Sequence, residues 1–273
     1  MRDARSGLAA IAIAGLVSIP IDALSADKAT SVPSNIPSEG VVGSNWEIQT
    51  TLYLWATALE GSLGNGNLPN ASLDISFSDI LKNLDGAVMA DLYVKHGNWM
   101  FLGDIVWANI SDKATLNVAN SPTLKYDQQL LILSAIGGYQ LPLNIDRLDL
   151  SATAGVRYQQ LSSETTLQSG TFAISTKRDS THAWLDPILG LALQYDINDR
   201  WRINGLTDVG GFGVGSQLTA QGFLAASYDW SDRVSTAFGY RAIYTNYESG
   251  SGANRFDYEG TLHGPFMSLG VSF

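Results

Sequence analysis

A period of two in hydropathy is the feature that most constrains this chain. Between Leu148 and Gln159 every second residue is apolar or tyrosine, and the residues between them are polar, small or charged. The same pattern runs through Thr181–Ile197 and Val234–Tyr244. Successive side chains of a β-strand point to opposite faces, so the pattern predicts strands with one apolar and one polar face. The strands are longer than the five or six residues usual in a globular protein.

Short and long connections alternate along the chain. Tight polar turns are expected at 96–98, 142–146, 198–200 and 231–233, and longer links at 57–86, 111–123, 163–180, 213–216 and 248–255. This asymmetry is typical of an antiparallel up-and-down transmembrane β-barrel. We expect about ten strands, with eight or twelve as alternatives, and both chain ends on the short-turn side. The predicted strands are 46–56, 87–95, 99–110, 124–140, 148–162, 181–197, 201–212, 217–230, 234–247 and 256–273.

Composition supports this fold class. Only 15% of the residues are charged, whereas about 25% is usual for soluble proteins. No apolar run after residue 26 is long enough to cross a bilayer as a helix, which leaves a closed barrel as the way to pair every backbone group in lipid. A soluble barrel is the alternative. The net charge of −10 argues against nucleic acid as a partner, and the absence of cysteine excludes disulfides and thiolate metal sites.

The N-terminus has the pattern of an export signal. Arg2 and Arg5 precede an apolar run from Gly7 to Pro20, and small residues follow up to Ala26. That run is too short for a spanning helix, so we interpret residues 1–26 as a signal peptide. Residues 27–45 are rich in Ser, Pro, Asn and Gly and are expected to be a flexible segment. One barrel domain then occupies residues 46–273.

The C-terminus ends in alternating apolar and small residues and stops on phenylalanine. This segment resembles the C-terminal β-signal of bacterial outer-membrane proteins, with Leu269, Val271 and Phe273 as its apolar positions. Residues 54–61 also resemble the opening strand of a porin-like outer-membrane family. The resemblance implies a location in the outer membrane of a Gram-negative bacterium. The implied partners are outer-membrane lipids and the barrel-assembly machinery.

Aromatic residues gather beside the predicted short turns. Tryptophan and tyrosine favour the membrane interface, where the ring is in lipid and its polar group is in water. We therefore predict an aromatic girdle at that end, formed by Trp99, Tyr139, Tyr195, Trp201, Tyr228 and Trp230.

Charges alternate onto the face opposite the lipid. The predicted lumen charges are Glu47, Asp91, Lys95, Asp104, Asp149, Arg157, Asp186, Arg202, Asp208 and Arg241, beside Tyr53, Trp55, Tyr93 and Trp184. Charges of both signs in a confined space should pair. Because barrels of eight strands are filled by side chains, a lumen of about ten strands favours a salt-bridged structural plug. A narrow, porin-like passage for small solutes or ions is the alternative.

The first long link contains a short helical pattern at residues 77–84. Ser78 or Asp79 could cap it, and Ile80, Leu81 and Leu84 would form its apolar side. It is expected to be either a helix at the rim or a loop that narrows the mouth.

Catalysis has little support in the sequence. His182 shares a face with Asp186, but four residues along a strand separate them by about 13 Å. No phosphate-binding loop, zinc motif or calcium loop occurs, so no cofactor or metal is expected. An enzyme acting on lipid or peptide is the weaker alternative, as is a surface adhesin acting through the loops.

Overall fold

The computed structural model describes residues 46–66, 70–115, 123–168 and 175–273. The part from Ser44 to Phe273 forms one compact unit. The predicted signal peptide and flexible segment lie outside the described residues. Among the residues described, no helix is long and apolar enough to cross a membrane.

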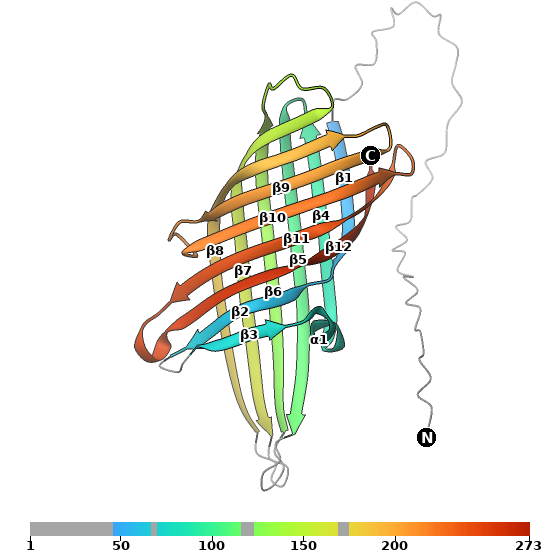
Figure 1. The fold of residues 1–273 in the computed structure, drawn as a ribbon. Helices are drawn as coiled ribbons and strands as arrows, with labels where there is room; N and C mark the ends of the chain where they lie inside the picture. The colour runs from blue at the N-terminus through green and yellow to red at the C-terminus, as the bar shows by residue number, and fades with distance from the viewer. Residues whose placement is uncertain (1–45, 67–69, 116–122, 169–174) are drawn as a thin grey trace, which may run out of the picture. The chain divides into compact units, whose positions relative to one another are not determined.

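The described residues lie almost entirely in strands (Figure 1). The first part contains β1 (Trp46–Trp55), β2 (Ala58–Asn65), β3 (Ala71–Ile75), α1 (Phe77–Lys82), β4 (Leu84–His96), β5 (Trp99–Thr115) and β6 (Thr123–Gln140). The second part contains β7 (Leu148–Gln168), β8 (Ser175–Asp196), β9 (Trp201–Gly211), β10 (Leu218–Asp229), β11 (Val234–Ser249), the 3-10 turn η1 (Gly252–Asn254) and β12 (Phe256–Ser272).

Ten of these strands close an antiparallel barrel. Every strand from β4 to β12 pairs with its neighbour in sequence, and β1 pairs with β4 on one side and β12 on the other. The closing seam runs from Gln49 opposite Ser272 to Trp55 opposite Phe266. The described strands therefore confirm the predicted closed antiparallel barrel, with two further strands, β2 and β3, added to it.

The first long link differs from expectation because much of it is strand. β2 continues from β1 after a break at residues 56–57, and it pairs with β12 from Ala58 opposite His263 to Asn65 opposite Phe256. β3 folds back on β2 and does not pair with β4, so the β2–β3 hairpin diverges from the barrel wall. At the break, the indole N–H of Trp55 donates to the backbone oxygen of Gly264 over 3.1 Å.

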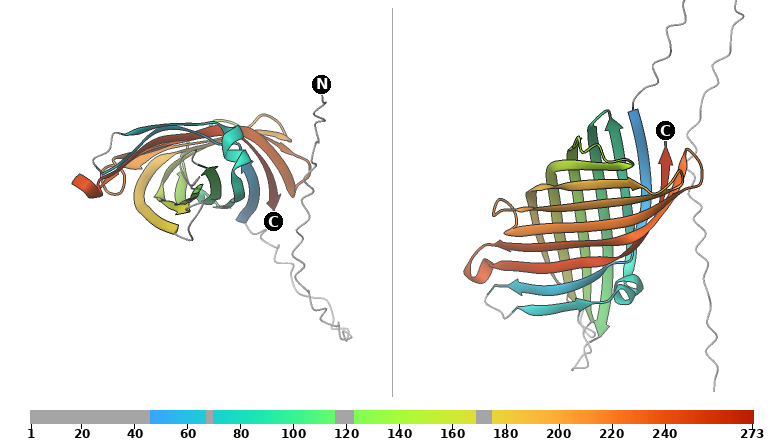
Figure 2. Two further views of the ribbon diagram at one scale, coloured as in Figure 1. Left: turned by 90° about the horizontal axis from the view of Figure 1, so that it is seen from below. Right: turned by 45° about the horizontal axis from the view of Figure 1, so that its top comes forward.

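The four short turns gather at one end of the barrel and the longer connections at the other (Figures 1 and 2). We call these the short-turn end and the loop end. Towards the loop end, β7 and β8 pair from Leu148 opposite Tyr195 to Gln168 opposite Ser175. Most of the link expected at 163–180 is therefore strand, because cross-strand pairing continues well beyond the apolar part of the pattern.

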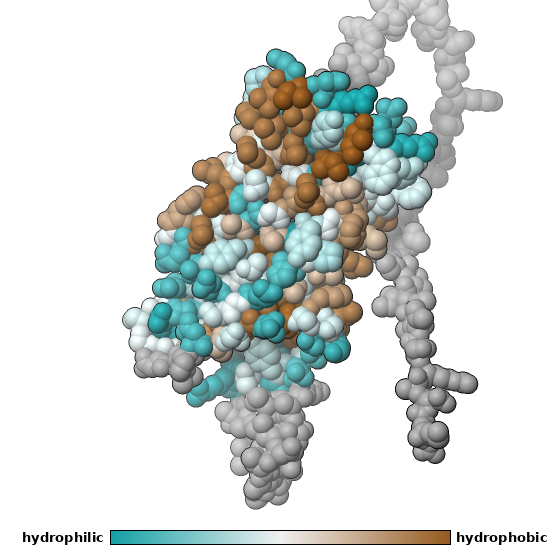
Figure 3. Space-filling model, in the orientation of Figure 1, coloured by the Kyte–Doolittle hydropathy of each residue, from teal (hydrophilic) through white to brown (hydrophobic). Residues whose placement is uncertain are grey.

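The outer surface carries an apolar band nearer the short-turn end. In Figure 3, apart from the turns themselves, hydrophobic side chains are densest towards that end and hydrophilic ones towards the loop end. Exposed apolar residues of this band include Leu54, Phe101, Leu133, Leu189, Leu224, Phe238, Met267 and Leu269. A water-soluble chain rarely exposes such a continuous apolar surface, whereas lipid would cover it.

Aromatic rings pair at the short-turn edge of the band. Trp99 and Tyr139 lie edge to face with ring centroids 4.9 Å apart, and Trp201 and Tyr228 do so at 5.0 Å. Tyr228 also contacts Trp230, with centroids 4.8 Å apart. These rings and Tyr195 project from the outer face of the barrel, where the predicted girdle was assigned.

The short helix α1 is capped differently from the expectation. The Ser76 hydroxyl accepts a hydrogen bond from the backbone N–H of Asp79 over 3.3 Å, so Ser76 is the N-cap instead of Ser78 or Asp79. A second hydrogen bond from the Ser76 hydroxyl, together with Lys82 one turn later, lowers the pKa of the Asp79 carboxyl below its ordinary value. The helix buries none of its residues.

Candidate functional site in the barrel lumen

The polar face of the strands points into the barrel. The structure places all the predicted lumen charges on this inner face, namely Glu47, Asp91, Lys95, Asp104, Asp149, Arg157, Asp186, Arg202, Asp208 and Arg241. Their surroundings change along the barrel axis from an open mouth, through a cavity, to a tightly packed middle.

Ion pairs surround the mouth at the short-turn end. The ammonium of Lys95 contacts Asp149 at 2.5 Å, and Gln140 donates a further hydrogen bond to Asp149. The guanidinium of Arg202 lies 2.9 Å from Asp196 and 3.5 Å from Asp229. These side chains remain partly exposed, so the lumen is accessible from this end.

A cavity of about 210 Å³ lies behind the mouth. Tyr53, Tyr93, Phe223 and Phe266 form aromatic parts of its wall, while Asp91 and Asp104 contribute carboxylates. It narrows to the side chain of Arg241, which occupies the middle of the barrel. The described part of the lumen thus contains both a cavity and closely packed, buried side chains.

Arg241 closes the inner end of the cavity by bonding to the opposite wall. It reaches from β11 to Asp104 on β5, with nitrogen–oxygen distances of 2.7 and 3.2 Å. It also donates to the hydroxyl of Tyr53 over 2.8 Å, and that hydroxyl donates to Asp104 over 2.5 Å. The guanidinium carbon lies 5.1 Å from the ring centroid of Trp55, within reach of a cation–π interaction.

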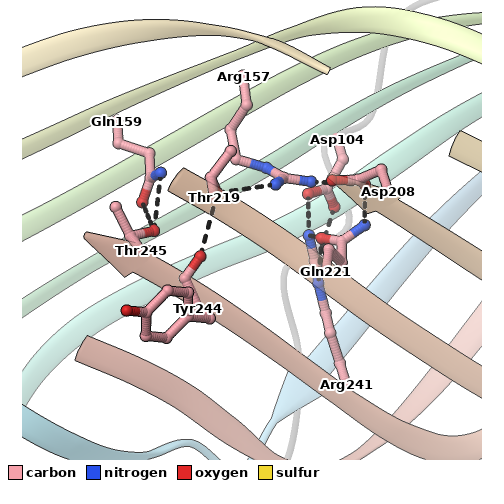
Figure 4. A network of polar contacts seen from close by, with 9 residues as sticks. All are labelled: Asp104, Arg157, Gln159, Asp208, Thr219, Gln221, Arg241, Tyr244 and Thr245. Atoms are coloured by element: carbon pink, nitrogen blue, oxygen red, sulfur yellow. Dashed lines mark hydrogen bonds and ion pairs between the residues drawn. The ribbon is translucent and has the colours of Figure 1, made fainter. Parts of the chain in front are cut away.

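A second buried ion pair joins this one through a glutamine (Figure 4). Arg157 on β7 and Asp208 on β9 approach to 2.8 Å, and their side chains are 0% and 2% exposed. The Gln221 amide donates to Asp208 over 3.2 Å and accepts from Arg241 over 2.9 Å. We call Tyr53, Asp104, Arg157, Asp208, Gln221 and Arg241 the lumen network.

Apolar side chains fill the space around the lumen network. Ile132, Ile136, Ile188 and Ile243 are each 2% exposed or less, although they stand on the otherwise polar face. Sequence reasoning missed them because it assigned that face by its charges. The signal was present: an isoleucine in the polar register of a strand marks a point where the lumen is packed.

Further polar contacts lie next to the lumen network. The Gln159 amide on β7 donates to the Thr245 hydroxyl on β11 over 3.1 Å. Asp186 accepts hydrogen bonds from the backbone and hydroxyl of Ser216 at 2.6 and 2.9 Å. The buried Asp186 thereby holds the β9–β10 turn against β8.

Aromatic rings from three strands stack on one another inside the lumen towards the loop end. Trp184 on β8 stacks on Tyr247 on β11 with ring centroids 4.1 Å apart, and His182 stacks on Phe256 of β12 at 3.5 Å. Tyr258 lies beside Trp184 and is 7% exposed. Sequence reasoning placed Trp184 in the lumen but did not single out Tyr247, Phe256 or Tyr258. We call the five residues His182, Trp184, Tyr247, Phe256 and Tyr258 the aromatic layer.

His182 and His263 have different polar partners: Nδ1 of His263 lies 2.7 Å from the Tyr240 hydroxyl, and its Nε2 lies 3.4 Å from Glu60. The hydroxyl of Ser180 lies 2.9 Å from Nε2 of His182, but among the described residues no carboxylate ion pair or hydrogen bond orients that ring. His182 and Asp186 bond to different partners. No group of three potential metal-ligating side chains occurs in the described ranges.

No known protein-family model matches this sequence, and no curated protein matches it either. Solved structures do match in shape. The outer-membrane protease OmpT from Escherichia coli has a TM-score of 0.53 at 8% identity, over 86% of this chain and 99% of that chain. The translocator domain of the autotransporter NalP from Neisseria meningitidis has a TM-score of 0.46 at 14% identity, over 85% of this chain and 90% of that chain. The fold is that of a bacterial outer-membrane β-barrel.

Proposed function

We propose that this chain is exported by residues 1–26, resides in the outer membrane of a Gram-negative bacterium and forms a barrel that does not conduct ions. The observation that supports this proposal most directly is the lumen network. Arg241 and Asp104 join opposite walls through side chains that are only 7% and 9% exposed. Ions would have to displace a bonded guanidinium from the middle of the lumen.

A second barrier supports the same conclusion. The aromatic layer lies on the loop side of the network, so a solute passing through would meet two seals in series. In the proposed orientation the short-turn end faces the periplasm and the loop end faces the exterior. Outer-membrane lipids cover the apolar band, and the barrel-assembly machinery recognises Leu269, Val271 and Phe273.

Conductance measurements on seal variants test the proposal. We expect no steady conductance from the purified protein in planar bilayers. The first variant removes both ion pairs of the lumen network by changing four residues to serine, namely Arg157, Asp208, Arg241 and Asp104. The second variant carries Trp184→Ala in the aromatic layer. Each is expected to stay closed because one seal remains, whereas the combined variant should conduct. Heat-modifiable gel migration verifies that each barrel is folded. Steady conductance from the unmodified protein would overturn the proposal.

A surface-interaction role is a second candidate, supported by the length of the strands. Beyond the apolar band, β7 and β8 carry exposed charges, including the pair formed by Lys177 and Glu164 at 2.7 Å. The hydrogen bond to Glu164 raises the pKa of the Lys177 ammonium above its ordinary value. The test compares the protein with a variant in which a short turn replaces residues 160–180. If the variant still folds as a barrel but no longer binds cell-surface material that the unmodified protein binds, this role is supported.

A further inference from the structure

The cavity behind the mouth has a surplus of acidic groups. Its wall contains the five acidic side chains Glu47, Asp91, Asp104, Asp149 and Asp229, and the three basic side chains Lys95, Arg202 and Arg241. Each base already contacts an acid, since Lys95 pairs with Asp149, Arg202 with Asp229 and Arg241 with Asp104. Among the described residues, Glu47 and Asp91 form no ion pair within 4.0 Å.

The two unpaired carboxylates lie at different depths. Glu47 is exposed at the mouth, whereas Asp91 faces the cavity beside Thr51, its cross-strand partner on β1. Four residues separate Glu47 from Thr51 along β1, which corresponds to about 13 Å along the strand. A carboxylate enclosed by protein is costly unless it is hydrogen-bonded, protonated or paired with a cation, and a positively charged occupant of the cavity would supply such a cation to Asp91.

Aromatic and aliphatic side chains form the wall between these levels. Tyr53, Tyr93, Phe223 and Phe266 line the cavity, together with Leu102 and Leu206. Aromatic faces attract cations, and the aliphatic parts of the wall can cover a hydrocarbon chain. A hydrated metal ion would not use this apolar surface, and an anion would be repelled by the acidic surplus.

We propose that this cavity binds a linear aliphatic polyamine that enters from the short-turn end. One terminal ammonium would pair with Asp91, the alkyl chain would lie along the aromatic wall, and another ammonium would reach Glu47 at the mouth. The volume of about 210 Å³ is sufficient for such a chain, since a single water needs only about 10–15 Å³ in the same measure. This inference is independent of whether the barrel conducts.

Calorimetric titration of the purified full chain in detergent, with spermidine as the probe, tests the inference. The neutral chain 1,8-octanediol tests whether charge is required. Asp91→Asn keeps the shape of the side chain and should weaken spermidine binding at least tenfold. Glu47→Gln should have a smaller effect, because its carboxylate is exposed to water. Asp146→Asn is the matched control, since Asp146 is an exposed acid in a turn at the same end and does not line the cavity.

The expected result is saturable spermidine binding that Asp146→Asn changes by less than twofold and that octanediol does not reproduce. Heat-modifiable migration of each variant establishes that its barrel is intact. Three results would overturn the inference: no spermidine binding, equal binding of octanediol, or an effect of Asp91→Asn no larger than that of Asp146→Asn. Because the assay measures binding alone, its outcome is separate from that of the conductance experiment.

Discussion

Breaking the ion pair between Arg241 and Asp104 should destabilise the barrel strongly. The side chains of this pair are 7% and 9% exposed, and Arg241 also bonds to Tyr53 and Gln221. Arg241→Met removes the cation while keeping much of the side-chain volume, and it leaves the buried Asp104 without its charge partner. Loss of one member of a buried pair costs about 3–5 kcal/mol. We expect the free energy of unfolding to fall by that amount.

A second variant separates charge pairing from packing. In the double variant Arg241→Met, Asp104→Leu neither charge of this pair remains, so it should be more stable than Arg241→Met alone. It should not fully reach the unmodified protein, because Tyr53 and Gln221 lose partners at a cost of about 1–3 kcal/mol each. Lys95→Met is the matched control: it breaks the pair with Asp149, whose side chains are 23% and 34% exposed, and should cost about 1 kcal/mol or less.

The assay is equilibrium unfolding in denaturant, followed by tryptophan fluorescence in detergent or lipid vesicles. Refolding from denaturant must retrace the same curve for the free energies to be compared. The reasoning is refuted if Arg241→Met costs no more than Lys95→Met, or if the double variant is less stable than Arg241→Met.

Three further predictions concern closure, assembly and the loop end. Gly264→Ala should impair folding, because the added Cβ would lie 1.9 Å from the backbone oxygen of Ala56. Gly222→Ala is the control and should fold normally, since no atom lies within 4 Å of the added Cβ. The heat-modifiable fraction on a gel measures the folding of both variants. Phe273→Asp should lower the amount of barrel assembled in cells, and undiminished assembly would show that the terminal phenylalanine is not recognised. The Lys177–Glu164 pair should persist as the pH rises and be lost only above the ordinary lysine pKa of 10.5, because the folded-state pKa is raised. Hydrogen exchange at residues 160–180 should therefore show no loosening, beyond the intrinsic pH effect, between pH 7 and 9.

The barrel itself was predictable because its determinants are local. Alternation in Leu148–Gln159 specifies which side chains share a face, and the short turns specify antiparallel neighbours. Closure into a barrel then follows from the requirement to pair every backbone group in lipid, and an even number of strands follows when all neighbours are antiparallel. The same local information placed Arg157 and Arg241 on the inner face, without an expectation of their partners.

The contacts between side chains on opposite sides of the lumen were not predictable. Asp104 and Arg241 are 137 residues apart, and Gln159 and Thr245 are 86 apart. Which of these meet depends on the strand number and the stagger of the barrel, and neither can be obtained from one strand's pattern. The β2–β3 hairpin was missed for a related reason. Its strands are short, β2 contains glycines at 61 and 64, and the hairpin is stabilised by the pairing of β2 with β12 more than by any alternation of its own.

The amino-acid sequence by itself determined the architecture and the two faces of its strands, since a period of two is a property of consecutive residues. Tertiary structure alone decided which side chains meet inside the lumen and that a cavity remains behind the mouth. Isoleucines from β6, β8 and β11 and aromatic rings from β8, β11 and β12 fill the lumen only after those strands have been brought opposite one another. The strand that carries a side chain determines which face of the barrel wall that side chain occupies. Its contacts across the lumen depend on all the strands that separate it from the opposite wall.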